Sequence, residues 1–326
     1  MEILILHPGA LGDIILSLPA LAVLRERFRN ARLTLAADAD SAGTVASAYA
    51  DRVFSLSRLP LYRLYGPDPL PPEDERFWCS FDRILSWTGS REVRFSARLA
   101  RIHPCVLAAD WQPGPTEQRH VSRLFIDSLH PWFPVPQQTP APEIRIDSVD
   151  NRHGREWLAQ LGWTASRPLV AIHPGAGNEA KRWGLHRFRE LGQLWRARGM
   201  LVIVEGPAER GLGESLASEF CADACLARGL PLRLLAAVLR HCRLFVGNDS
   251  GIAHLAAGLG LPSVVLFGPT SPVNWAPLGR QVSVLRNTSG CPACKSEKAG
   301  LHTCLDNISV EMVLQSANME LSAHPE

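Results

Sequence analysis

The sequence predicts an α/β fold built from two doubly wound, Rossmann-like domains. Short apolar runs typical of buried strands alternate with longer helical patterns, which favours parallel sheets covered by helices on both faces. The pattern also restarts halfway along the chain. Residues 4–10 read Leu-Ile-Leu-His-Pro-Gly-Ala, and residues 170–176 read Val-Ala-Ile-His-Pro-Gly-Ala. Each copy lies at the end of the first strand of its half, so we expect twin domains rather than one large sheet.

The first predicted domain covers residues 1–145, and the second covers residues 146–326. In the first, we expect strands at 2–7, 32–37, 81–87 and 104–109, with helices at 13–28 and 90–102. In the second, we expect strands at 168–173, 201–205, 244–247 and 263–268, with helices at 185–198, 208–220, 232–241 and 251–258. Residues 309–321 read as a terminal amphipathic helix.

Two stretches carry five prolines each and few apolar anchors. Leu59–Pro72 is expected to be a mobile loop, with a plain surface insertion as the alternative. Pro131–Pro142 is expected to connect the two domains.

Composition excludes several classes of protein. The 326 residues are 46% hydrophobic and 20% charged, which is ordinary for a globular protein and excludes disorder over most of the chain. No apolar run approaches the 18 or more residues of a membrane-spanning helix, and the start Met-Glu lacks the basic segment of a signal peptide. The net charge of +2 is too small to suggest a nucleic-acid-binding protein. We therefore expect a cytoplasmic protein with reduced cysteines.

The first candidate site is the loop Gly9-Ala-Leu-Gly-Asp13, between the first strand and the first helix. Ligands bind at the carboxyl ends of strands in such sheets, and Gly9 and Gly12 allow close backbone approach. This is not the dinucleotide-binding fingerprint, and a carboxylate at its end would repel a pyrophosphate. Asp13 is better suited to accept a proton, with a helix cap as the alternative.

The second candidate is the loop His173-Pro-Gly-Ala-Gly-Asn-Glu-Ala-Lys-Arg-Trp183, which opens the second half. Gly175 and Gly177 with Lys181 suit an anionic ligand, which backbone amides and one compact cation would hold. Only three of the 34 basic residues are lysines, so Lys181 is conspicuous. The alternative is a solvated loop lysine.

The third candidate is Gly247-Asn-Asp-Ser-Gly251, followed by His254. A helix begins inside it and offers free amides to a phosphate. Ser250 can cap the helix or contact the ligand, and Asp249 can accept hydrogen bonds from sugar hydroxyls. His254 lies about one turn into the helix, with a core histidine as the alternative.

A fourth candidate, Glu209, follows another strand in Glu205-Gly-Pro-Ala-Glu209, where a carboxylate could chelate a ribose diol. The alternative is an acidic residue in the first turn of a helix.

Together these segments resemble glycosyltransferase family 9, the ADP-heptose:lipopolysaccharide heptosyltransferases. The matching pieces are His-Pro-Gly-Ala-Leu-Gly-Asp-Ile-Ile-Leu-Ser-Leu-Pro-Ala-Leu, Ala-Lys-Arg-Trp, Val-Gly-Asn-Asp-Ser-Gly-Ile-Ala-His-Leu-Ala-Ala and Phe-Gly-Pro-Thr-Ser-Pro. They occur in the family's order across nearly the whole chain. Residues 55–80 and 110–145 carry no matching motif, and in this family those regions would contact the acceptor.

The resemblance implies a GT-B fold, in which two Rossmann-like domains face a cleft, and an inverting transferase without an essential metal. It also implies that the first domain binds the acceptor and the second binds an ADP-heptose-type donor. Asp13 then corresponds to the catalytic carboxylate. The donor-binding residues correspond to Lys181, Glu209, Asp249, Ser250, Gly251 and His254. In such proteins the last helix usually crosses back to the first domain, and the acceptors are anionic lipids at the inner membrane leaflet.

Two further groups of residues could bind ligands. Cys291, Cys294, His302 and Cys304 have a chelating composition, although their irregular spacing favours reduced structural thiols over zinc. Four arginines recur at helical spacing and would share one helix face that contacts lipid phosphates, with a solvated face as the alternative: Arg91, Arg94, Arg98 and Arg101.

Three other functions compete with heptosyl transfer. One is a GT-B epimerase or a transferase that uses another nucleotide sugar. The second is a non-catalytic nucleotide-sugar-binding protein, against which Asp13 and Lys181 both argue. The third is a nicotinamide oxidoreductase, which the missing Gly-x-Gly-x-x-Gly fingerprint disfavours.

Overall fold

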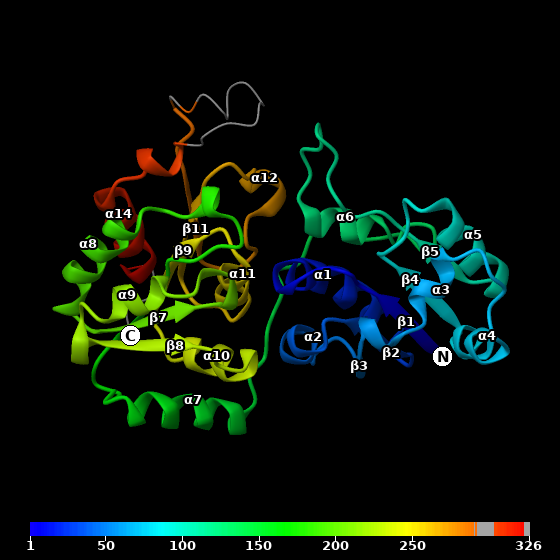
Figure 1. Ribbon diagram of the computed structural model, residues 1–326, viewed down its shortest axis with the longest axis horizontal. Helices are drawn as coiled ribbons and strands as arrows, with labels where there is room; N and C mark the ends of the chain where they lie inside the picture. Colours follow the sequence, from blue (N-terminus) through cyan, green and yellow to red (C-terminus); the bar gives the residue numbers. More distant parts are fainter. Residues whose placement is uncertain (290, 292–302, 323–326) are drawn as a thin grey trace. The chain divides into compact units, whose positions relative to one another are not determined.

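The computed structural model describes residues 1–289, 291 and 303–322 of the chain. The chain divides into two compact units, Met1–Pro142 and Glu143–Glu326. Each unit is an α/β layer structure with its own parallel sheet (Figure 1).

The sheet of the first unit has five parallel strands in the order β3-β2-β1-β4-β5. Its strands are β1 (Glu2–Leu6), β2 (Arg32–Ala37), β3 (Arg52–Ser55), β4 (Arg83–Ser86) and β5 (Val106–Ala108). The central strand β1 is fully apolar after Glu2, and Ile5 pairs with Leu35 on one side and Leu85 on the other. Continuous apolar strands of this kind are buried on both faces.

Helices of the first unit are α1 (Leu11–Arg27), α2 (Ala39–Val45), α3 (Leu61–Tyr65), α4 (Pro72–Cys79), α5 (Val93–Ile102) and α6 (Val121–Asp127). A short 3-10 helix, η1, covers Leu56–Arg58. Leu4 and Leu6 of β1 pack with Trp78 of α4 and with Phe95 and Leu99 of α5. Helices α1 and α6 pack against each other.

The second unit has a six-stranded parallel sheet in the order β11-β10-β9-β6-β7-β8. Its strands are β6 (Leu169–His173), β7 (Met200–Glu205), β8 (Ala224–Arg228), β9 (Leu244–Asn248), β10 (Ser263–Phe267) and β11 (Val282–Arg286). All residues of β6, β7, β9 and β10 are buried, whereas β8 and β11 at the sheet edges are partly exposed.

The α-helices of the second unit are α7 (Ser148–Gln160), α8 (Leu185–Arg196), α9 (Leu212–Ala217), α10 (Leu232–Leu239), α11 (Gly251–Gly258), α12 (Pro272–Trp275) and α14 (Val310–Ser322). Its 3-10 helices are η2 (Glu179–Lys181), η3 (Pro207–Glu209), η4 (Cys221–Asp223) and η5 (Leu305–Asn307). One core joins Ile172, Phe188 and Leu266 to Val313 and Ala317 of α14.

The expected alternation of strands and helices is confirmed in both units, and all eight predicted strands are present with their ends shifted by at most two residues. Two expectations were wrong in detail. Residues 208–220 form no single helix, because Gly211 adopts a positive φ of 91° and separates η3 from α9. The stretch Leu59–Pro72 contains helix α3, because Leu64 is buried in the core and anchors it.

The arginine face also differs from expectation. The apolar side chains of the last helix, α14, pack into the core of the second unit, and its expected crossing to the first domain stays a prediction. Helix α5 begins only at Val93, so Arg91 precedes it and instead pairs with Asp110 at 2.6 Å. The helix face therefore carries three arginines: Arg94, Arg98 and Arg101.

Sheet order decides where ligands can bind. In each sheet, the chain leaves its first strand in one direction and later returns to the other side of it, so β1 neighbours β4 and β6 neighbours β9. Loops at such a reversal point diverge and open a crevice at the carboxyl edge of the sheet. The segments after β1, β6 and β9 carry most of the candidate residues, and Glu209 follows the neighbouring strand β7.

Within the part of the chain that the structure describes, no helix has both the length and the apolar character needed to cross a bilayer.

Candidate functional site

The loop after β1 holds Asp13 in the first turn of α1. The Ala10 amide donates a hydrogen bond to Asp13 Oδ2 at 3.1 Å, so the carboxylate does cap the helix. A side chain at Gly9 would overlap Asp13 and His7, which explains the glycine there. The Asp13 side chain is only partly buried, so capping and ligand contact are compatible.

His7 stabilises the conformation of this loop. The Gly9 amide donates to His7 Nδ1 at 3.0 Å, and the imidazole stacks on Trp111 and Phe125 with an edge contact to Trp87. Burial lowers the pKa of His7 to about 3, so the ring is neutral in the folded protein. A neutral ring is required for Nδ1 to accept the Gly9 amide.

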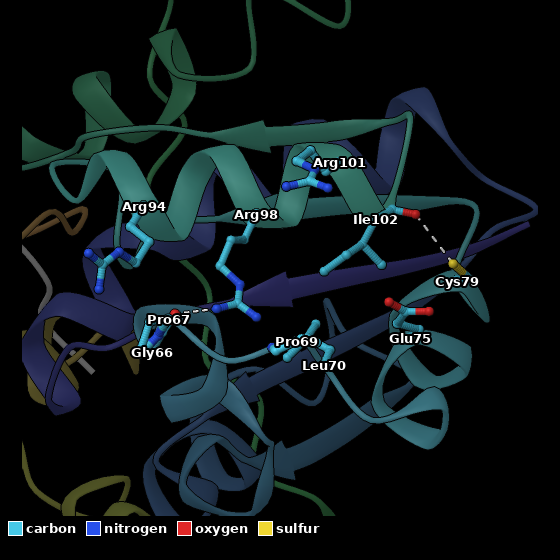
Figure 2. Close-up of a pocket in the computed structure, with 10 residues that line it drawn as sticks. All are labelled: Gly66, Pro67, Pro69, Leu70, Glu75, Cys79, Arg94, Arg98, Arg101 and Ile102. Carbon is cyan, nitrogen blue, oxygen red and sulfur yellow. Dashed lines mark hydrogen bonds between the residues drawn. The ribbon is translucent and has the colours of Figure 1, made fainter.

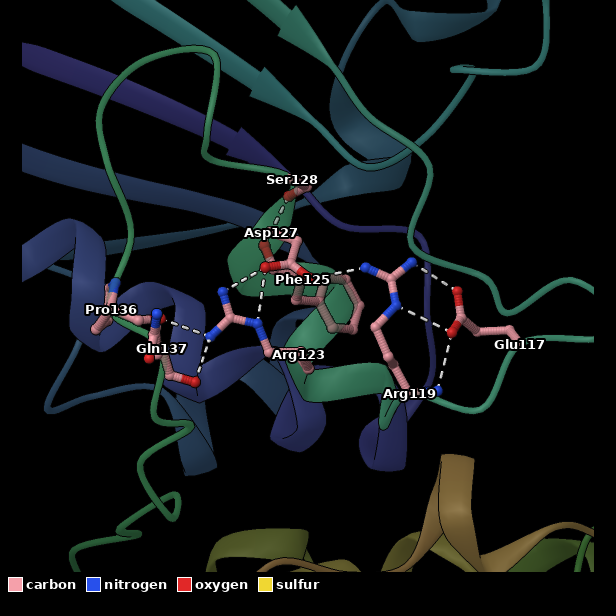
Figure 3. A network of polar contacts seen from close by, with 8 residues as sticks. All are labelled: Glu117, Arg119, Arg123, Phe125, Asp127, Ser128, Pro136 and Gln137. Carbon is pink, nitrogen blue, oxygen red and sulfur yellow. Dashed lines mark hydrogen bonds and ion pairs between the residues drawn. The ribbon is translucent and has the colours of Figure 1, made fainter.

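A polar network links α6, which carries Phe125, to the segments on either side of it (Figure 3). Phe125 in turn stacks on His7. Arg119 donates to Glu117 at 2.7 Å and to Asp127 at 3.0 Å. Arg123 also pairs with Asp127 and donates to the Pro136 carbonyl. The hydrogen bonds from Arg119 lower the pKa of Glu117 to about 2. The network thus lies in a region where the sequence offered no motif.

In the second unit, Asn248 joins the loops after β6 and β9. Its amide nitrogen donates to the Pro174 carbonyl at 2.8 Å, and its oxygen accepts from the Trp183 amide at 3.0 Å. Asn248 is fully buried. This residue was not singled out from the sequence, although it lies inside the Gly247–Gly251 motif.

Lys181 and Asp249 are brought together. Lys181 Nζ lies 2.8 Å from Asp249 Oδ2, with side chains 30% and 6% exposed. From their sequence positions, these residues were expected to have separate partners, a phosphate for Lys181 and a sugar hydroxyl for Asp249. The structure shows them as one ion pair whose ammonium group still reaches solvent.

Glu209, His173 and Ser250 form a hydrogen-bonded chain. His173 Nε2 lies 2.8 Å from Glu209 Oε1, and His173 Nδ1 lies 3.1 Å from Ser250 Oγ. The hydrogen bond from His173 lowers the pKa of the Glu209 carboxyl below its usual range. Sequence reasoning gave His173 no role. The sequence feature that could have pointed to His173 is the repeat, in which His173 occupies the same place as His7 at the end of the opening strand.

The remaining predicted residues surround this chain. Ser250 caps α11, with Gly251 as the first helical residue. His254 lies one turn further and is buried, as the core-histidine alternative requires. A side chain at Gly175 would overlap Glu209, whereas Gly177 has open space around its Cα. Gly177 is therefore not needed for packing.

The three arginines of α5 line a pocket of about 670 Å³ in the first unit (Figure 2). Arg98 extends toward the segment 66–70 and donates to the carbonyls of Gly66 and Asp68. Arg94 and Arg101 are exposed, and neither lies in an ion pair with a carboxylate of the described residues. Glu75 is the one acidic residue in the pocket lining.

The cysteine cluster is only partly described. Cys291 and Cys304 are both fully buried, whereas Cys294 and His302 lie outside the described residues. Among residues 1–289, 291 and 303–322, no group of three metal-ligating side chains is assembled.

Comparison with known proteins places this architecture. "Lipooligosaccharide heptosyltransferase 2" of Haemophilus influenzae is 31% identical over 218 residues, which cover 62% of this chain and 61% of that protein. The match thus spans about three fifths of that relative's length. The structure of E. coli ADP-heptose lps heptosyltransferase II superposes with a TM-score of 0.75 at 20% identity, over 99% of each chain. The glycosyl transferase family 9 structure from Veillonella parvula has a TM-score of 0.82 at 22% identity, over 99% of this chain and 98% of that chain.

The fold is of the GT-B class. It has two Rossmann-like units with candidate residues at the carboxyl edges of their sheets, and these structural relatives share that architecture. The model of the family described as "Glycosyltransferase family 9 (heptosyltransferase)" matches residues 104–304, more than half of the sequence. The chain therefore belongs to glycosyltransferase family 9.

Proposed function

We propose that the protein is an inverting, metal-independent transferase that moves a heptose from ADP-heptose to a lipopolysaccharide core acceptor. The observation that carries this proposal is the Lys181–Asp249 pair, where β6 neighbours β9 in a chain of family 9. The names of the relatives support the donor and acceptor classes.

In the proposed reaction, the second unit binds the donor. The diphosphate lies by Lys181 and the first-turn amides of α11, with Ser250, Gly251 and His254 beside it. Asp249 and Glu209 provide carboxylate oxygens for the hydroxyls of the heptose and the ribose. Lys181 and the amides then stabilise the charge that grows on the departing ADP.

The first unit supplies the acceptor and the base. Asp13 removes the proton of the acceptor hydroxyl as that oxygen attacks the anomeric carbon, and ADP leaves from the opposite face. This chemistry requires the two units to bring their ligands together. The proline-rich segment Pro131–Pro142 connects the predicted domains and is where we propose that a hinge lies.

Product analysis tests this function against its alternatives. The protein is incubated with ADP-heptose, with and without a lipopolysaccharide core acceptor, and with other nucleotide sugars in parallel. We expect heptose transfer with inverted configuration and release of one ADP. An epimerase would instead convert the nucleotide sugar without acceptor, and a binding protein would bind ADP-heptose unchanged.

Replacing Lys181 with Ala is expected to weaken ADP binding at least tenfold, because a hydrogen bond to a charged group contributes about 1.5–3 kcal/mol. The buried Asp249 carboxylate also loses its counter-charge and would repel the diphosphate. Calorimetric titration with ADP measures the effect.

The matched control is Arg155→Ala, which removes one exposed positive charge from α7 in the same unit. We expect its ADP affinity to equal that of the wild type. Unchanged affinity in the Lys181 variant would place this lysine outside the donor site.

We also propose that the protein acts at the cytoplasmic face of the inner membrane, where Arg94 and Arg101 contact anionic lipid phosphates. The pocket of Figure 2 supports this, because two exposed arginines are among the residues that line a space of about 670 Å³ with a single acidic residue. Each basic side chain near an anionic bilayer contributes about 1 kcal/mol to binding. Arg98 is left out of the test because it holds the neighbouring loop.

Removing both charges, Arg94→Gln with Arg101→Gln, is expected to lower binding to vesicles of anionic phospholipid by about tenfold or more. Co-sedimentation at low salt measures this, with zwitterionic vesicles as background. The control variant, Arg152→Gln with Arg155→Gln, removes the same charge from exposed positions on α7. An equal loss in both variants would show that net charge rather than the pocket drives binding.

A further inference from the structure

The inference concerns Asn248, the last residue of β9. Its side chain is fully buried, and it contacts three backbone groups of the segment that follows β6. Its Nδ2 donates to the Pro174 carbonyl at 2.8 Å and to the Gly175 carbonyl at 3.3 Å, and its Oδ1 accepts the Trp183 amide at 3.0 Å. A side-chain amide has two hydrogens to donate and an oxygen that accepts, so these contacts use both kinds of group.

The contacts join both ends of the segment 174–183 to the sheet. The ladder between β6 and β9 ends with the pair His173 and Gly247. The Asn248 side chain continues the connection one residue further, to the carbonyls that begin the segment and to the amide that ends it. A segment tied at both ends has less conformational freedom to lose when a ligand binds.

Lys181 and Asp249 both lie next to this connection. Lys181 precedes Trp183 by two residues, and Asp249 follows Asn248 directly. The Asp249 amide donates to the Leu266 carbonyl of β10 at 3.0 Å, so the sheet fixes one member of the ion pair. The other member belongs to the segment that Asn248 holds. The 2.8 Å contact between Lys181 Nζ and Asp249 Oδ2 therefore depends on that segment keeping its place.

Other hydrogen bonds of the segment have a different effect. The Lys181 amide donates to the Asn178 carbonyl at 3.0 Å, which closes η2 within the segment itself. Arg182 Nε donates to the Ala176 carbonyl at 3.1 Å, and its guanidinium group also donates to the Ala208 carbonyl of η3 at 3.4 Å. These bonds shape the turn and attach it to η3, whereas the buried side-chain amide attaches it to β9.

We propose that Asn248 is a positioning residue of the donor site, which holds the segment 174–183 so that the Lys181 ammonium group is already in place beside Asp249 when the diphosphate binds. Asn248 is fully buried, so it acts on the ligand through Lys181 and not by contact. The Lys181 side chain is 30% exposed, so its ammonium group can reach an anion from this position. The inference rests on the proposed donor site and adds a residue to it.

A double-mutant cycle on ADP binding tests the proposal. Asn248→Ala removes the three contacts, Lys181→Ala removes the ammonium group, and the double variant removes both. Calorimetric titration gives the ADP affinity of each protein. We expect Asn248→Ala alone to weaken ADP binding about five- to tenfold, because a displaced lysine loses most of its charge-assisted hydrogen bond. In the Lys181→Ala background, the same change should weaken binding by less than about twofold.

Ser263→Ala is the matched control. Ser263 is the fully buried first residue of β10 in the same sheet, and its hydroxyl donates to the Leu261 carbonyl at 2.7 Å. The control also loses a buried hydrogen bond, but at the amino end of a strand, whereas the candidate residues follow carboxyl ends. We expect urea unfolding to show a lower free energy of unfolding for Ser263→Ala and for Asn248→Ala. The ADP affinity of Ser263→Ala should equal that of the wild type.

A merely structural role gives a different result in the cycle. If Asn248→Ala weakens ADP binding by the same factor with and without Lys181, or leaves the affinity unchanged, the proposal is overturned. The proposed function fails separately: in that case the wild type does not bind ADP, or Lys181→Ala binds it as tightly as the wild type does.

A second measurement does not depend on the folding of Asn248→Ala. If that variant does not fold, Asn248→Ser takes its place in the cycle, because a hydroxyl can still satisfy one of the buried backbone groups. Hydrogen exchange is measured on the wild type in either case. We expect the Trp183 amide to be protected equally with and without ADP, because Asn248 holds it before the ligand arrives. Protection that appears only with ADP would show that the ligand orders the segment, and would overturn the proposal.

Discussion

Replacing Asp13 with Asn is expected to lower turnover by two to four powers of ten and to leave ADP affinity unchanged within about twofold. A positioned general base contributes roughly 10²–10⁴-fold, and Asn cannot accept the acceptor's proton. The fold should persist, since the Asn side-chain oxygen can still accept the Ala10 amide that caps α1. Steady-state kinetics of heptose transfer and calorimetry with ADP measure the two effects.

Asp40→Asn is the matched control. Asp40 is an exposed carboxylate in the first turn of α2, so like Asp13 it lies in a first helical turn, but without the glycine-rich loop. We expect its turnover to stay within about twofold of the wild type. Near-normal turnover in the Asp13 variant would show that Asp13 is not the general base of the proposed mechanism and serves only as a helix cap.

The second large effect is a loss of stability in mild acid that depends on His7. Its pKa is lowered to about 3 in the fold, whereas an unfolded histidine titrates near about 6.5. Between these two pKa values, His7 is protonated in the unfolded chain and neutral in the folded chain. The free energy of unfolding therefore falls as the pH falls. One such group changes the free energy of unfolding by roughly 1.4 kcal/mol per pH unit. From pH 6 to pH 4 this amounts to somewhat under 3 kcal/mol.

Urea unfolding at several pH values measures this loss, with the fluorescence of Trp87 and Trp111 as a probe beside the ring. In His7→Asn the side-chain oxygen can replace Nδ1 as the acceptor for Gly9, and the slope of stability against pH should be shallower by up to one proton. If that variant does not fold, the wild type still decides. Its His7 ring resonances should not move in NMR spectra between pH 7.5 and pH 5, and a shift there would contradict the prediction.

The fold could be predicted where strands are buried and apolar. The strands β1, β6, β9 and β10 can be recognised in the sequence, because each is a continuous hydrophobic run next to a glycine-rich turn. The outer strands β3, β8 and β11 were missed, because each is half-exposed, carries an arginine and has no clear apolar run. Helix α7 was missed for a related reason, since it buries only Gly154 and Leu158.

The site could be predicted as a set of residues and not as a set of contacts. Glycine-rich loops at strand ends pointed to Asp13, Lys181 and Asp249 one at a time. Local spacing says nothing of which strands become neighbours, and β6 and β9 are joined only through the sheet order. The Lys181–Asp249 pair and the role of His173 therefore required the structure.

The repeated tetrapeptide His-Pro-Gly-Ala shows that the role of a residue in one half of a duplicated fold cannot be inferred from its counterpart in the other half. Both copies end a central strand and both imidazoles are buried, so backbone and burial are alike. One ring is enclosed by tryptophan and phenylalanine and serves as inert scaffolding. The other faces a carboxylate delivered by a distant segment. Identical local sequence thus carries different chemistry in the two halves, and the residues that decide it lie outside the repeat. Assigning a role to one copy by analogy with the other would assign the wrong one.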